Sequence, residues 1–95
     1  MSIAQTILRQ LGGSHRLVAM TGANWFVDNG NGVTFRIKGS RKANFVEIRL
    51  NSWDLYDIKT GIVGRKLRNV RESENIHVEN LIRTVEKMTG LYLTL

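Results

Sequence analysis

The residues best suited to chemistry in this sequence are the basic side chains of its middle section. Between residues 36 and 71, ten Lys and Arg residues stand against three acidic residues, a local net charge of +7. Lys and Arg bind nucleic acids by contacting backbone phosphates and releasing condensed counterions. The pattern therefore predicts contact with nucleic acid or a nucleoprotein. The predicted contact residues are Arg36, Lys38, Arg41, Lys42, Arg49, Arg65, Lys66 and Arg68.

Aromatic side chains near the expected turns could add stacking to these phosphate contacts. Trp25 and Trp53 are candidates for an exposed stacking or protein-recognition surface, and Phe45 has the same strand parity as Arg49. In a domain of this size, large aromatics also serve as packing residues. Both interpretations stay open at this point.

The same residues admit a second function. A sheet with one solvated face needs polar side chains there, and Lys or Arg also protects edge strands from aggregation. The alternative is a module that docks on an acidic protein surface, using Trp25, Trp53 and the basic face. Phosphate binding weakens steeply with salt, whereas a protein interface selects one partner.

Catalytic and metal-binding patterns are weak in this sequence. It contains no cysteine, which excludes a thiol nucleophile, cysteine-bound zinc and a disulfide framework. His15 and His77 are isolated, and Asp54 and Asp57 are three residues apart, which places them on opposite sides of a strand. We therefore expect a non-enzymatic binding module with no cofactor and no metal.

Length and composition limit the architecture to one small domain. The chain has 95 residues, 42% of them apolar, and a net charge of +6. No apolar run approaches the roughly 18 residues of a membrane span, and the N-terminus lacks the features of a secretion signal. These features favour a location in the reducing cytoplasm, without contact with a membrane.

Two helices have readable ends. Ser2 and Gln5 have the spacing of a capping box, and Gly12 follows the last apolar residue of the pattern, which predicts a helix over residues 3–11. A second apolar stripe at helical spacing, from Val78 to Met88, predicts another helix. Asn75 is its expected N-cap, and Gly90 is expected to end it.

Between the helices the hydrophobic period changes to two, which indicates a sheet. The expected strands lie at residues 17–20, 25–27, 33–38, 45–51 and 55–59, and residues 64–71 are expected to form an edge strand rather than a basic arm. Together these elements predict an α+β two-layer sandwich. Its antiparallel sheet would have four to five strands, with both terminal helices on one face.

Strand parity extends this prediction to single side chains. If Val33, Phe35 and Ile37 face the helices, then Arg36, Lys38 and Arg49 emerge together on the other face. The apolar tail at residues 91–95 is expected to be ordered, with Leu93 buried. It would either add an edge strand to its own sheet or pair with a second copy in a homodimer.

Four segments resemble a known group of sequences. In chain order, IAQTILRQLGG, LVAMTGANWFV, LYDI and TGLYLTL look like a family of small uncharacterised proteins of bacteriophages and other bacterial mobile elements. The resemblance implies an accessory role in phage or plasmid biology inside a bacterial host, including inhibition of a host defence system. It supplies no activity and no functional residue for this chain.

Overall fold

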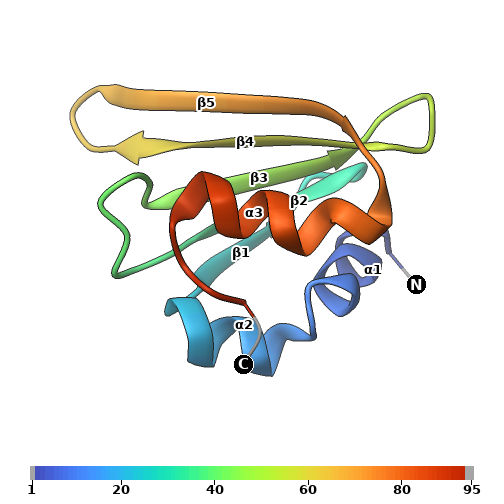
Figure 1. Cartoon of the computed structure of the whole chain (residues 1–95), viewed down its shortest axis with the longest axis horizontal. Helices are drawn as coiled ribbons and strands as arrows, with labels where there is room; N and C mark the ends of the chain where they lie inside the picture. The colour runs from blue at the N-terminus through green and yellow to red at the C-terminus, as the bar shows by residue number, and fades with distance from the viewer. Residues whose placement is uncertain (1, 94–95) are drawn as a thin grey trace.

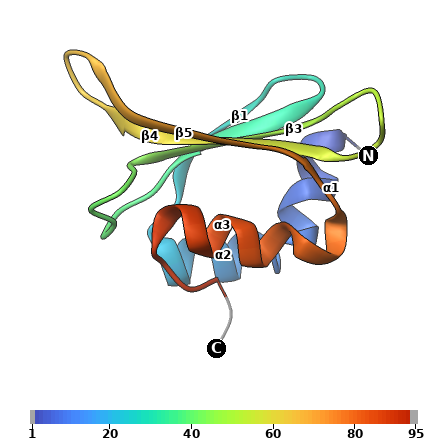
Figure 2. The same ribbon diagram turned by 45° about the horizontal axis from the view of Figure 1, so that its top comes forward.

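The computed structural model describes residues 2–93 as one antiparallel sheet with helices on one face (Figures 1 and 2). The five strands follow one another in space as in sequence: β1 (Asn24–Asp28), β2 (Gly32–Arg36), β3 (Phe45–Leu50), β4 (Tyr56–Val63) and β5 (Leu67–Ile76). The helices are α1 (Ile3–Gln10), α2 (Ser14–Thr21), the short 3₁₀ turn η1 (Val78–Asn80) and α3 (Leu81–Thr89). This is the predicted α+β arrangement. In residues 2–93 no helix is long and apolar enough to cross a bilayer.

The helix ends that carried local signals are where the sequence predicts them. The Ser2 hydroxyl accepts from the Gln5 N–H at 3.1 Å, and the Gln5 side chain accepts from the Ser2 N–H at 3.4 Å, completing the capping box. Gly90 ends α3 in the left-handed conformation, with a φ of 73°.

Two local predictions are wrong. Asn75 is not a helix cap, because β5 continues through it to Ile76, and η1 then precedes α3. Residues 17–20 form part of α2 rather than a strand. A four-residue apolar run does not distinguish helix from strand, and here only Leu17 of the run is buried, with Thr21 one helical turn further on.

The core lies between the sheet and the helices. Val33, Phe35 and Ile37 face it as parity predicts, and so do Val46 and Ile48 of the neighbouring strand. On the helix side, the core includes Ile7, Leu11 at the end of α1, Leu17, Leu81 and Val85.

The C-terminal tail contributes to the same core. Leu93 is 1% exposed, and its N–H donates to the Glu86 carboxylate at 2.8 Å, which confirms the predicted burial. Residues 91–93 are not a strand, so they do not extend the sheet. The predicted role of Leu95 lies outside the described residues.

Candidate functional site

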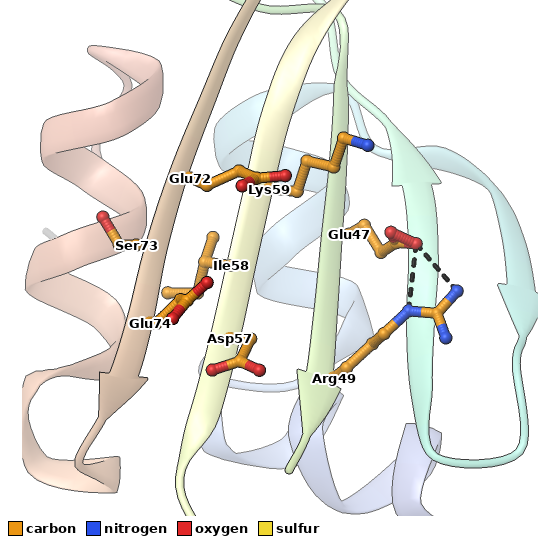
Figure 3. A pocket seen from close by; sticks show the side chains of 8 residues that line it. All are labelled: Glu47, Arg49, Asp57, Ile58, Lys59, Glu72, Ser73 and Glu74. Carbon is orange, nitrogen blue, oxygen red and sulfur yellow. Dashed lines mark hydrogen bonds and ion pairs between the residues drawn. The ribbon is translucent and has the colours of Figure 1, made fainter.

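The face of the sheet that the helices leave uncovered, here called the open face, carries mixed charge at its centre. Arg49 lies opposite Asp57, and Lys59 lies between Glu47 and Glu72. The Arg49 guanidinium contacts the Glu47 carboxylate at 3.0 Å (Figure 3). Arg49 is therefore already paired with an acid and has further acids beside it. The centre of the open face is not a basic surface.

The other predicted basic residues gather at one end of the sheet. Because the strands are antiparallel, the β2–β3 loop and the β4–β5 hairpin lie at the same end, on the left in Figure 1. We call this region the basic end. Its cations are all exposed: Arg36, Lys38, Arg41, Lys42, Arg65, Lys66 and Arg68.

No acidic residue lies close in sequence to balance these cations. Residues 29–46 and 58–71 contain no Asp or Glu. Within residues 2–93 the only ion pair is that of Arg49 with Glu47, so the cations of the basic end have no acidic partner there. Clustered like charges repel each other, and a bound polyanion relieves that repulsion.

Lys38 belongs to the basic end but not to the open face, where parity had placed it beside Arg36 and Arg49. Strand β2 ends at Arg36, two residues earlier. The Lys38 N–H donates to the Thr21 carbonyl at 2.8 Å, and its side chain packs beside Gly22 at the end of α2. The chain leaves the sheet at this point, so period-two alternation no longer applies.

Asparagine side chains fix the two basic loops to each other. The Asn44 amide donates to the Val63 carbonyl at 2.9 Å, and its oxygen accepts from the Val63 N–H at 2.7 Å. Asn44 thus extends the β3–β4 ladder by one step beyond the Phe45–Gly61 pair. Further out, Asn69 donates to the Lys42 carbonyl at 3.0 Å. The φ of 56° at Asn69 accompanies a bulge in β5, and asparagine tolerates this backbone region.

A serine ties the β2–β3 loop to helix α3 on its other side. The Ser40 hydroxyl donates to the Thr89 carbonyl at the end of α3, and accepts from the N–H groups of Lys42 and Ala43. These hydrogen bonds hold in place the loop that carries Lys38, Arg41 and Lys42. Lys42 shares a surface depression with Arg83, Lys87 and the acid Glu86 of α3, so three cations and one carboxylate line it.

Trp25 borders the basic end on the open face. Trp25 is 79% exposed, and it lines a hollow of about 380 Å³ together with Arg36, Phe45 and Val63. Trp25 has a φ of 57°, because β1 bulges where two of its residues lie opposite Phe35. A bulky residue in this backbone region is strained by about 1 to 3 kcal/mol, and such strain is concentrated at functional sites.

The other aromatic candidates do not join Trp25 at its exposed surface. Trp53, 78% exposed, lies in the β3–β4 turn at the opposite end of the sheet. Phe45 is on the open face as parity predicts but is only 9% exposed, because its ring packs across Gly61 and beside Leu67. Phe45 therefore forms the floor of the hollow and is not available for stacking.

The residues weighed for acid–base or metal chemistry lie apart. His15 is exposed on α2, and His77 is exposed just before η1. Within residues 2–93 no three His, Asp or Glu side chains group as a metal site. Burial raises the pKa of Tyr56, whose hydroxyl donates to the Gln10 side chain, far along β4 from the basic end.

Comparisons with models of known protein families, with curated proteins and with solved structures found no match for this chain.

Proposed function

We propose that this protein is a non-enzymatic binding module that holds nucleic acid, alone or in a nucleoprotein, at the basic end of its sheet. The observation that carries the proposal is the clustering of seven exposed cations on two hydrogen-bonded loops and the strand ends beside them, without an ion-pair partner within residues 2–93. Phosphate contacts need cations that are exposed, close together and held in place. Arg49 and Trp53 are not part of this surface.

A bound phosphate would meet different charges on the open face and at the basic end. At the centre of the open face, a phosphate would meet Glu47, Asp57, Glu72 and Glu74 as well as the basic residues (Figure 3). At the basic end it would meet a cluster of cations, with Glu86 as the acid in the depression beside Lys42. The proposed contact therefore runs over the β2–β3 loop and the β4–β5 hairpin, with the open face reached only at Arg36 and Trp25.

Salt titration of binding to a labelled oligonucleotide tests the proposal. Each phosphate contact contributes about 0.7 to the slope of log affinity against log salt for a single strand, and about 0.9 for a duplex. Changing both Arg65 and Lys66 to Gln should make the slope shallower by about 1.4 to 1.8. Arg9 and Arg16, exposed on α1 and α2, allow a double Gln variant with the same change in net charge.

The two double variants separate a local contact from a general charge effect. The proposal requires the hairpin variant to lose slope and the helix variant to keep it. Equal losses in both, or no binding by the wild-type protein at about 50 mM salt, would contradict it. In the second case the alternative moves to first place: a host-protein inhibitor that uses the same cations against an acidic protein surface. The mobile-element context suggested by the sequence resemblance stays a prediction.

A further inference from the structure

The hollow beside Trp25 lies where the cations of the basic end meet the open face. Phe45 and Val63 are part of its apolar lining, and Arg36 contributes a cation to its edge. Val63 leads directly into the hairpin turn with Arg65 and Lys66. A ligand in this hollow would therefore contact an apolar floor and an indole, with cations on the adjoining loops.

The bulge in β1 separates two consecutive aromatics. Phe26 packs on the core residue Phe35, with ring centroids 5.5 Å apart, and is 37% exposed. Trp25 instead keeps its large exposed surface at the hollow. The structure thus holds a bulky side chain in a strained backbone conformation while leaving most of its ring in solvent.

The acid nearest to this hollow along β3 is already occupied. Glu47 follows Phe45 by two residues on the same face, and its carboxylate is held by Arg49 through contacts of 3.0 and 3.1 Å. The hollow therefore combines an exposed aromatic residue, an apolar floor and the unpaired cation Arg36, with further cations on the adjoining hairpin. These are the features with which proteins hold unpaired bases and their phosphates.

We propose that the nucleic acid bound at the basic end is single-stranded, with one base stacked on Trp25 in the hollow and the adjoining phosphates on Arg36 and the hairpin cations. This inference rests on the proposed function and specifies its substrate class. In a duplex, neighbouring base pairs already cover the faces of each base, so the indole would have no exposed base face to stack on. Any unpaired base offers such a face, so the binding should tolerate many sequences.

The chain offers a matched pair of variants, because its two tryptophans are almost equally exposed and lie at opposite ends of the sheet. The probes are a labelled oligothymidylate, its oligouridylate counterpart, and a duplex of equal length. Trp25→Ala should weaken single-strand binding by about 5- to 150-fold, the range expected for loss of one stacked base. Trp25→Phe should restore part of the loss, and Trp53→Ala should bind like the wild type.

Tryptophan fluorescence gives a second, independent readout. The chain has two tryptophans, so Trp25 is the only one left in Trp53→Ala. Adding unlabelled oligothymidylate should quench this variant's fluorescence and leave the emission of Trp25→Ala unchanged. Thermal unfolding of each variant controls for loss of the fold.

The outcomes separate this inference from the proposed function. If the wild-type protein binds nucleic acid but Trp25→Ala keeps its affinity and Trp25 is not quenched, the stacking inference is wrong while the basic end remains the binding surface. Equal or tighter wild-type binding to the duplex would likewise overturn the single-strand assignment. If the wild type binds none of the three probes, the proposed function fails with it.

Discussion

At each end of the sheet an asparagine side chain links neighbouring strands, but the two ends carry different charge. Asn44 directly precedes β3 and Asn51 directly follows it, and each side chain braces the neighbouring strand. At the basic end Asn44 makes two hydrogen bonds to the Val63 backbone. At the opposite end Asn51 donates to Asp57 and Asn75 and accepts from two N–H groups of the β3–β4 turn.

The charged side chains of the two ends are used differently. At the opposite end, Asp28 accepts from the Gly30 N–H at 2.8 Å, and Asp57 accepts from the Asn75 N–H at 3.1 Å. The Asp28 carboxylate holds the β1–β2 turn and the Asp57 carboxylate holds β5 near its end, so both stabilise the chain itself. In residues 2–93 the cations of the basic end make no side-chain hydrogen bond or ion pair. The contrast indicates which charges belong to the fold and which are available to a partner.

Truncation in the core should have the largest effect and should not distinguish the two ends. Leu93→Ala removes a side chain that is 1% exposed and leaves a cavity between the sheet and the helices. The free energy of unfolding should fall by about 2 to 5 kcal/mol. Denaturant unfolding measures it, and an unchanged midpoint would show that the tail does not stabilise the domain.

Substitution of Asn44 and of Asn51 should affect stability alike but oligonucleotide binding differently. Asn44→Ala and Asn51→Ala each remove at least two hydrogen bonds, so each should lower the free energy of unfolding by about 1 to 3 kcal/mol. Asn44→Ala should also weaken oligonucleotide binding, because it loosens the link between the two basic loops. Asn51→Ala should not. Equal losses of affinity at temperatures where both variants are folded would remove the functional contrast between the ends.

The smallest expected effect is at the centre of the open face. Arg49→Gln breaks the pair with Glu47, in which the Arg49 side chain is 47% exposed. Exposed pairs contribute under about 1 kcal/mol, so the unfolding midpoint should change little. The salt slope of binding should also stay the same, because Arg49 lies outside the basic end. A loss of about 0.7 to 0.9 in slope would extend the binding surface onto the open face.

The sequence predicts those features whose signals are local. The capping box at Ser2, the helix end at Gly90 and the alternation around Phe35 each depend on residues a few positions apart, and the structure confirms all three. The run at residues 17–20 is too short to show whether its period is that of a helix or a strand, so the sequence does not predict α2.

The distribution of charge over the surface depends on how the strands pair, which residue spacing in the sequence does not show. The count of basic residues located the positive segment, but the register of β3, β4 and β5 places acids around Arg49. Likewise, the link from Asn44 to Val63 spans 19 residues, and the bulge at Trp25 follows from pairing with β2. Asn44 and Asn69 were not candidates for this reason. The one sequence feature that points to these two asparagines is that each lies beside a basic turn.

Mapping the bound surface tests the central claim most directly. Amide chemical shifts of the wild-type protein, followed during titration with a short oligothymidylate, report both ends of the sheet in one experiment. We predict that the largest changes fall in residues 38–44 and 64–69 and at the Trp25 indole, while residues 28–31 and 51–55 stay unchanged. Changes centred on Glu47, Arg49 and Asp57, or on the turn around Trp53, would contradict the account.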